Sequence, residues 1–134
     1  IRGNGLWNAI FGYISIKEDL NTVKGVVFDH VGETAGLGAE ITQDWFKERF
    51  VDEKLFDSDY NLMGIKVSKT NNDPSNLDKS DHEVDFISGA TITCDGVTDM
   101  ITERMNHYIP YFKSIKESET VLAFSMSNID SNIN

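Results

Sequence analysis

Apolar and polar residues alternate in blocks along the chain, and these blocks predict a sheet in the N-terminal half. Segments 7–16 and 22–30 mix aromatic and β-branched residues, which favour strands. The polar turn 17–21 separates them, so we expect an antiparallel pair. Segment 62–68 predicts a further strand. Segment 32–38 holds three glycines and predicts a loop in which backbones approach closely.

Apolar residues at steps of three and four predict two helices. The first is short and amphipathic and covers residues 42–50. In the second, the apolar positions run over 97–109, which places its N-cap at Thr93 or Asp95. Because a proline usually interrupts a helix, we expect this one to stop near Pro110.

The remaining segments are polar and set the domain organisation. Residues 70–83 are rich in Asn, Asp and Ser, which predicts a surface loop. Residues 1–116 then form one domain, and 117–134 form a C-terminal tail that we expect to be partly disordered. The expected fold is α+β: a small, mostly antiparallel sheet flanked by helices.

Composition and charge exclude several classes of function. The formal net charge of −10 would repel a nucleic acid, and no basic cluster offsets it. The longest apolar stretch, 6–16, is too short to span a bilayer. Because the chain opens on Ile1, we expect a preceding segment, such as a membrane anchor, to be missing here. The single cysteine and three histidines show no spacing typical of a metal site.

The run Ser88-Gly89-Ala90-Thr91 is the candidate site for chemistry. Its small residues let the backbone approach a bulky anion, and the helix that follows would offer unpaired N–H groups to a phosphate. A tight strand-to-helix connection, with Thr93 as a cap, explains the same residues without any ligand. The residues alone leave both interpretations open.

A family resemblance separates these interpretations. Residues 85–91, Asp-Phe-Ile-Ser-Gly-Ala-Thr, resemble the flavinylation motif Asp-x-x-(Ser/Thr)-Gly-Ala-Thr of the FMN-binding domain family. Segments 5–7, 19–21 and 32–38 are similar to those of C subunits of Na⁺-translocating NADH:quinone oxidoreductases. The resemblance implies that a flavin transferase, with FAD as donor, joins FMN to the hydroxyl of Thr91 as a phosphoester.

The resemblance also assigns the residues around the flavin. It implies that the transferase recognises Asp85, Ser88, Gly89 and Ala90, and that no residue of the chain is catalytic. Ala35 stands where relatives usually have proline, which loosens the loop without removing a side-chain donor. The predicted cofactor-binding residues are Trp7, Glu33, Thr34, Gly36, Leu37, Gly38, Lys66, Ser88, Gly89, Ala90, Thr91 and Thr93.

The function implied is that of a one-electron carrier. It would be one subunit of a membrane redox complex that oxidises NADH, reduces quinone and pumps Na⁺, in the bacterial inner membrane with this domain facing the periplasm. The other subunits would be its partners, and it would have no independent catalytic activity. Two alternatives remain: the G subunit of an Rnf-type ferredoxin:NAD⁺ complex, and a flavin-free module that binds an anion or a partner.

Overall fold

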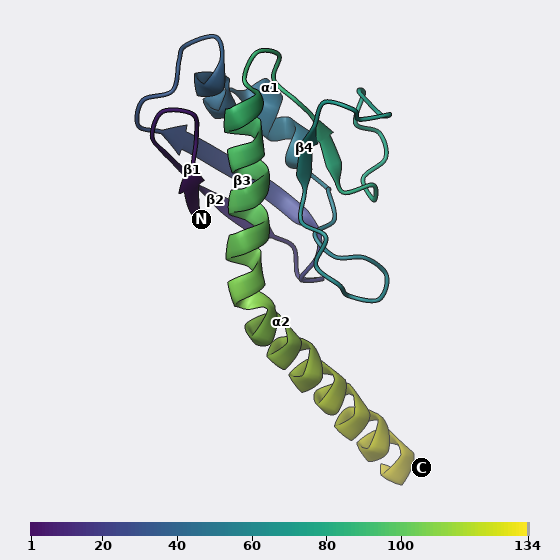
Figure 1. Cartoon of the computed structure of the whole chain (residues 1–134). Coiled ribbons are helices and arrows are strands. Elements are labelled where there is room, and N and C mark those ends of the chain that lie inside the picture. Colours follow the sequence, from purple (N-terminus) through teal and green to yellow (C-terminus); the bar gives the residue numbers. More distant parts are fainter. Residues whose placement is uncertain (134) are drawn as a thin grey trace.

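The computed structural model describes the backbone of residues 1–133 and the side chains of residues 1–127. The α+β class is confirmed, with a small sheet flanked by helices (Figure 1). The elements are, in order, β1 (Arg2–Asn4), β2 (Ala9–Ile16), β3 (Val23–His30), the 3-10 helix η1 (Gly38–Thr42), α1 (Asp44–Lys47), the 3-10 helix η2 (Glu48–Phe50), β4 (Lys66–Ser68), β5 (Glu83–Asp85) and α2 (Thr91–Ile133).

The main sheet has the order β1-β2-β3, and both of its pairings are antiparallel. The expected pairing of the two N-terminal strands is confirmed, with Ile10 opposite His30 and Ile14 opposite Val26. Ile10 and Phe28 are buried on the inner face, whereas Tyr13 and Val27 are exposed. This alternation is what a sheet with one solvated face requires.

Two elements differ from the sequence prediction. The strand expected over 62–68 is reduced to β4. Its partner β5 was not predicted, and the two short strands form a separate parallel pair. The helix expected over 42–50 is α-helical only in α1, and η1 and η2 flank it. No side chain caps α1, which limits the length of regular helix here.

The core lies between the main sheet, the short helices and α2. Phe28, Phe46 and Phe50 form an aromatic cluster with ring centroids 5.2–5.9 Å apart. The first half of α2 runs beside β1 and β4 and buries Val97, Met100 and Ile101 against this core. The start of α2 is therefore fixed by long-range packing.

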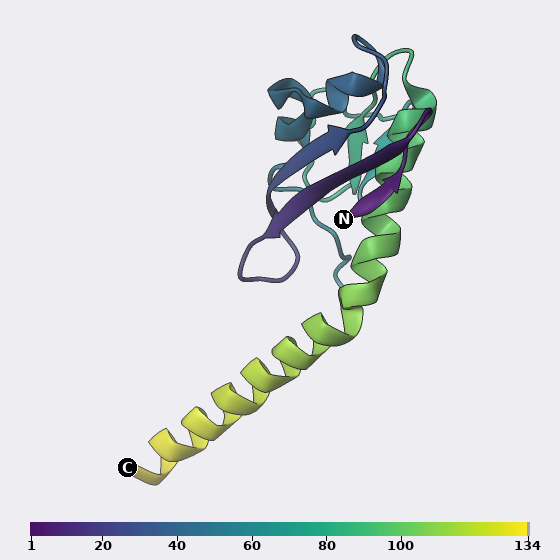
Figure 2. The ribbon, with the colours of Figure 1, turned by 90° about the vertical axis from the view of Figure 1, so that its left-hand side faces the viewer.

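The long helix begins and ends elsewhere than the sequence predicts. Its first residue is Thr91, because the N–H of Cys94 donates to the carbonyl of Ala90 at 2.9 Å; neither Thr93 nor Asp95 is the cap. It also continues past Pro110 to Ile133. Proline removes one helical hydrogen bond, and Figures 1 and 2 show α2 bending where its second half leaves the body. The predicted tail thus begins inside α2, and Asn134 lies outside the described residues.

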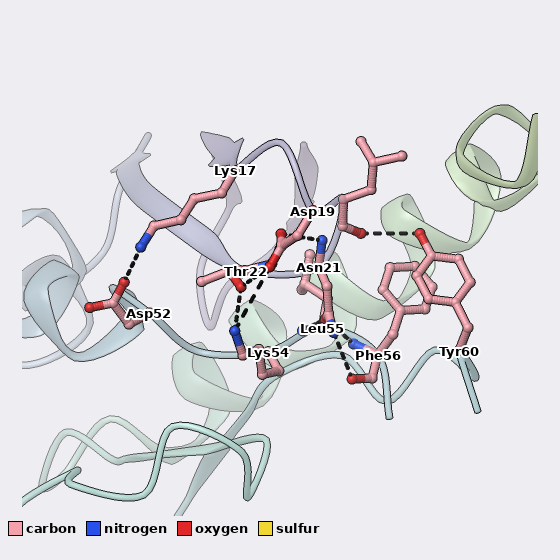
Figure 3. Close-up of polar contacts among 10 residues, drawn as sticks. Lys17, Asp19, Asn21, Thr22, Asp52, Lys54, Leu55, Phe56 and Tyr60 are labelled. Carbon is pink, nitrogen blue, oxygen red and sulfur yellow. Dashed lines mark hydrogen bonds and ion pairs between the residues drawn. The ribbon is translucent and has the colours of Figure 1, made fainter. Parts of the chain in front are cut away.

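A polar cluster fastens the turn between β2 and β3 to the segment after η2 (Figure 3). Asp19 accepts hydrogen bonds from the N–H groups of Asn21 and Thr22, and the Asn21 side chain bonds both the N–H and the carbonyl of Phe56. Burial raises the pKa of Asp19, but the hydrogen bonds from the Thr22 hydroxyl and from the N–H groups of Thr22 and Asn21 outweigh burial and lower the pKa to about 2. The Asp-Leu-Asn segment is therefore structural in this fold.

Candidate functional site

A hollow of about 220 Å³ opens where α2 begins. Three separate parts of the chain line it: the turn between β1 and β2, the loop before η1, and the start of α2 with the turn that precedes it. The lining residues are Leu6, Trp7, Glu33, Thr34, Leu37, Gly38, Gly89, Ala90, Thr91, Ile92 and Thr93.

Most of the residues predicted to bind a cofactor meet at this hollow. Nine of the twelve line it, although they come from three segments that lie far apart in the sequence. The other three are Gly36 and Ser88, which adjoin lining residues in the chain and are exposed, and Lys66, which lines a different hollow that also includes Thr91. The sequence did not predict Leu6 or Ile92, although Leu6 lies inside the Gly-Leu-Trp segment that carried part of the resemblance.

The turn before α2 depends on Gly89. Its φ of +77° is one that residues with a side chain rarely adopt, and an added Cβ would lie 2.9 Å from Leu37 Cδ2. The N–H of Ala90 donates to the carbonyl of Ile87 at 3.1 Å and closes the turn. The glycine therefore fixes the path of the chain into α2 and lets the two walls of the hollow approach each other.

The first turn of α2 has free hydrogen-bond donors. Ala90 occupies the N-cap position and has no side-chain oxygen to offer. Within the described residues, no acceptor bonds the backbone N–H of Thr91, Ile92 or Thr93, and none bonds the Thr91 hydroxyl. Free amides and the positive end of a helix dipole favour an anion at this position.

Glu33 joins the three walls of the hollow. Its buried carboxylate accepts from the N–H of Leu6 at 2.6 Å, from the N–H of Trp7 at 3.0 Å and from the Thr93 hydroxyl at 2.8 Å. Burial alone would raise the pKa of Glu33, but these three donors outweigh burial and lower it. Glu33 and Thr93 therefore bond to each other, and their polar atoms serve to hold the walls together.

The rim of the hollow is apolar and exposed. Leu6, Trp7, Leu37 and Ile92 have relative exposures of 46%, 68%, 40% and 56%, and all four border the same hollow. Large apolar side chains gathered around one concavity are typical of a ligand-binding surface. A flat aromatic ligand would cover them.

Two residues of the 85–91 motif, Asp85 and Phe86, are held by a side chain that does not line the hollow. Asp85, at the end of β5, accepts through its carbonyl a bond of 2.7 Å from Arg49 Nη1, and the carbonyl of Phe86 accepts from the same atom at 3.2 Å. Cys94 is buried, which raises the pKa of its thiol, and it accepts a weak bond from the N–H of Ile87. These contacts give Arg49 and Cys94 structural roles.

The described part of the chain contains neither a cluster of metal-binding side chains nor a helix that could span a membrane. No group of three or more His, Cys, Asp or Glu side chains there could hold a metal ion. Over the same residues, no helix is both long and apolar enough to cross a membrane.

Comparison with known proteins gives a consistent result. The model of the family described as "FMN-binding domain" matches residues 5–106. The chain is 38% identical over 120 residues to the C subunit of the Na(+)-translocating NADH-quinone reductase of Neisseria meningitidis, covering 88% of this chain and 44% of that protein. For the same subunit of Pseudomonas aeruginosa the identity is 39% over 101 residues, or 75% and 38% of the two chains.

Solved structures agree with the sequence relatives. The crystal structure of the C subunit of the Na(+)-translocating NADH-quinone reductase from Parabacteroides distasonis matches with a TM-score of 0.70 and 39% identity, covering 81% of this chain and 52% of that one. NqrC of Shewanella oneidensis matches with a TM-score of 0.61 and 36% identity, covering 72% and 42%. The chain spans less than half of the length of the Neisseria and Pseudomonas relatives.

Proposed function

The chain belongs to the FMN-binding domain family, and we propose that it carries FMN on Thr91 as the electron-transferring part of the C subunit of a Na⁺-translocating NADH:quinone reductase. The observation that carries this proposal is the position of Thr91 at the border between an apolar rim and the free amides of α2. The relatives, which are named as C subunits of this reductase, favour this complex over the Rnf-type one. Its other subunits would be the partners.

The residues of the hollow fit the two ends of FMN. The apolar rim suits the isoalloxazine ring, and the unpaired N–H groups of Thr91, Ile92 and Thr93 suit the phosphate. The hollow, at about 220 Å³, is smaller than the roughly 300–1,000 Å³ common for whole-ligand pockets. Part of the flavin would therefore stay exposed, as a group that must pass electrons to other subunits requires.

The attachment is a proposed phosphoester. A flavin transferase would use FAD as donor: Thr91 Oγ1 bonds to the phosphorus of the FMN half, the diphosphate P–O bond breaks, AMP leaves, and the hydroxyl proton goes to the solvent or to the transferase. Thr91 is half-buried and its hydroxyl makes no hydrogen bond within the described residues, so the oxygen is free to react. Asp85, Ser88, Gly89 and Ala90 form the segment that the transferase would read.

The roles of the chain are to bind and orient. FMN, when bound, supplies reversible one-electron chemistry. Trp7 and Leu37 would cover the ring and exclude water from one side of it, and Glu33 would keep the turn that carries Trp7 against α2. The chain would need no catalytic residue of its own. In the assembled complex this domain would lie on the periplasmic side of the bacterial inner membrane, held by an anchor outside the present sequence.

Intact mass and peptide mapping after co-expression with a flavin transferase test this function. We expect the mass of FMN less one water on the peptide that contains Thr91. Thr91→Ala should lose it completely, whereas the matched variant Thr91→Ser, which keeps a hydroxyl, should retain part of it. An unmodified wild-type peptide in the presence of active transferase would reject the proposal in favour of a flavin-free module.

A further inference from the structure

We propose that a second hollow, on the other side of Thr91, binds phosphate oxygens through Lys66 and Lys69. It has a volume of about 230 Å³ and is lined by Lys66, Val67, Ser68, Lys69, Thr70, Phe86, Thr91, Cys94 and Asp95. This inference rests on the proposed function, because it assigns the charged end of the same flavin site. Neither the family motif nor the apolar hollow includes Lys69.

Among the residues that the structure describes, Thr91 alone lines both hollows. A group bonded to its hydroxyl therefore stands at the junction between an apolar space and a space bordered by two lysines. The apolar side has no lysine or arginine in its lining, so it offers a phosphate no cationic side chain. The second hollow supplies the cationic side chains that the first hollow lacks.

Both lysines are available to a ligand. Lys66 and Lys69 are exposed, and within the described residues neither forms an ion pair. Lys69 Nζ lies 5.9 Å from the centre of the ring of Phe86, which lines the same hollow. Asp95, on the same hollow, is the opposing charge, so the two lysines leave a net positive lining. In a chain of net charge −10, such a site is the exception.

The strand that carries Lys66 is fixed against α2. The N–H of Val67 donates to the Thr98 hydroxyl at 3.0 Å, and the N–H of Lys66 donates to the carbonyl of His82 at 2.8 Å. Val67 and Ser68, between the lysines, are buried. Lys66 is thus held on a rigid strand beside Thr91, which suits a binding site, and Lys69 lies in the turn that directly follows this strand.

Two sources could supply the phosphate oxygens. One is the phosphoester that remains on Thr91, and the other is the diphosphate of the donor during attachment. Both are anions whose oxygens accept charge-assisted hydrogen bonds from ammonium groups. The rate of attachment and the environment of the resident phosphate distinguish the two sources.

The test compares Lys66→Gln and Lys69→Gln with Lys113→Gln, an equal change of charge at an exposed position on α2. We expect each of the first two to slow attachment of FMN to Thr91 by about tenfold, the value of one charge-assisted hydrogen bond, and Lys69→Arg to recover most of the rate. In the finished flavoprotein, the ³¹P chemical shift reports on the resident phosphate. A slower attachment with an unchanged ³¹P shift would identify the donor diphosphate, and a moved shift the resident phosphoester.

A binding measurement keeps this inference separate from the proposed function. Inorganic pyrophosphate, added to the unmodified chain, should shift the backbone NMR signals of Lys69, Thr70 and Thr91, and both glutamine variants should weaken this response. If wild-type Thr91 is never flavinylated but pyrophosphate binds, the carrier function fails and the anion site stands. If neither lysine variant differs from Lys113→Gln in attachment or in binding, the anion site is rejected.

Discussion

The two buried glutamates of this protein have opposite surroundings. Glu33, at the hollow, is 7% exposed and accepts three hydrogen bonds from two backbone N–H groups and a hydroxyl. Glu53, after η2, is fully buried, and within the described residues neither of its carboxylate oxygens accepts a hydrogen bond; the same holds for the buried Oδ1 atom of Asn76. Lys79 Nζ forms an ion pair with Glu53 Oε1 at 3.7 Å.

These surroundings shift the two pKa values in opposite directions. Around Glu33 the donors outweigh burial and lower its pKa. Around Glu53 burial dominates and the charge of Asp81 adds to it, so the pKa rises to about 7 despite the attraction of Lys79. The candidate site is therefore built around an ionised carboxylate that favours folding, whereas the far side of the core holds one whose ionisation opposes folding.

Removing the Glu33 carboxylate should have the largest effect. Glu33→Ala leaves the Thr93 hydroxyl and the N–H groups of Leu6 and Trp7 without their acceptor, so we expect a loss of about 2–4 kcal/mol in the free energy of unfolding. Flavin attachment should fall as well, because the turn that carries Trp7 loses its contact with α2. Urea unfolding measures the first effect and mass spectrometry the second. A loss no larger than that of Glu48→Ala, at an exposed position, would contradict this role.

The pH dependence of stability should follow Glu53. Its folded pKa is raised above the usual value of 4.5 to about 7. The folded state thus binds the proton more tightly, and stability falls as pH rises from about 5 to 8. The fall should be at most roughly 3 kcal/mol. Glu53→Gln should flatten this part of the profile in urea unfolding. Equal slopes in wild type and variant would show that Glu53 is not responsible.

Glu33 should act at the acid end of the same profile. Its pKa is lowered, so its contribution is complete above the unfolded value of 4.5 and is lost as pH falls through the folded pKa. Stability should therefore pass through a maximum near mildly acidic pH.

Changing the cation beside Glu53 should have the smallest effect. Lys79 lowers the pKa of Glu53 by attraction, so Lys79→Gln should raise that pKa further. Lys79 is partly exposed, which limits the change through solvent screening. Carbon-13 NMR of the Glu53 carboxyl gives the shift directly, with Lys24→Gln as the control for net charge. A lower pKa in Lys79→Gln would contradict the assigned attraction.

The sequence predicted which segments meet at the hollow, but not how they are joined. The resemblance brought together the loop at 32–38 and the turn before Thr91, and nine of the predicted residues do share one hollow. It assigned Glu33 and Thr93 to the ligand, and the structure adds that these two side chains bond to each other across 60 residues of sequence. Such a contact has no local pattern, since it depends on how the loop after β3 meets the start of α2.

Local rules also failed where tertiary packing decides the outcome. Capping rules expected an oxygen-bearing side chain at the start of α2, and Ala90 occupies that position instead. Pro110 was expected to end the helix, but α2 continues past it to Ile133. β5 consists of three residues and is a strand only because β4 lies beside it. Lys69 stayed unnoticed because one lysine in a polar stretch carries no signal of its neighbours.

The walls around Thr91 come from segments that lie far apart in the sequence, so the site forms late in folding. Ring-covering residues near the N-terminus, the lysines of β4 and of the turn after it, and the helix that carries the hydroxyl leave the ribosome in that order. Each closure of a long intervening segment costs chain entropy. The two hollows exist only once the last of these segments has docked. A transferase that requires both of them would discriminate against unfinished chains, and the flavin would then mark molecules that have completed folding.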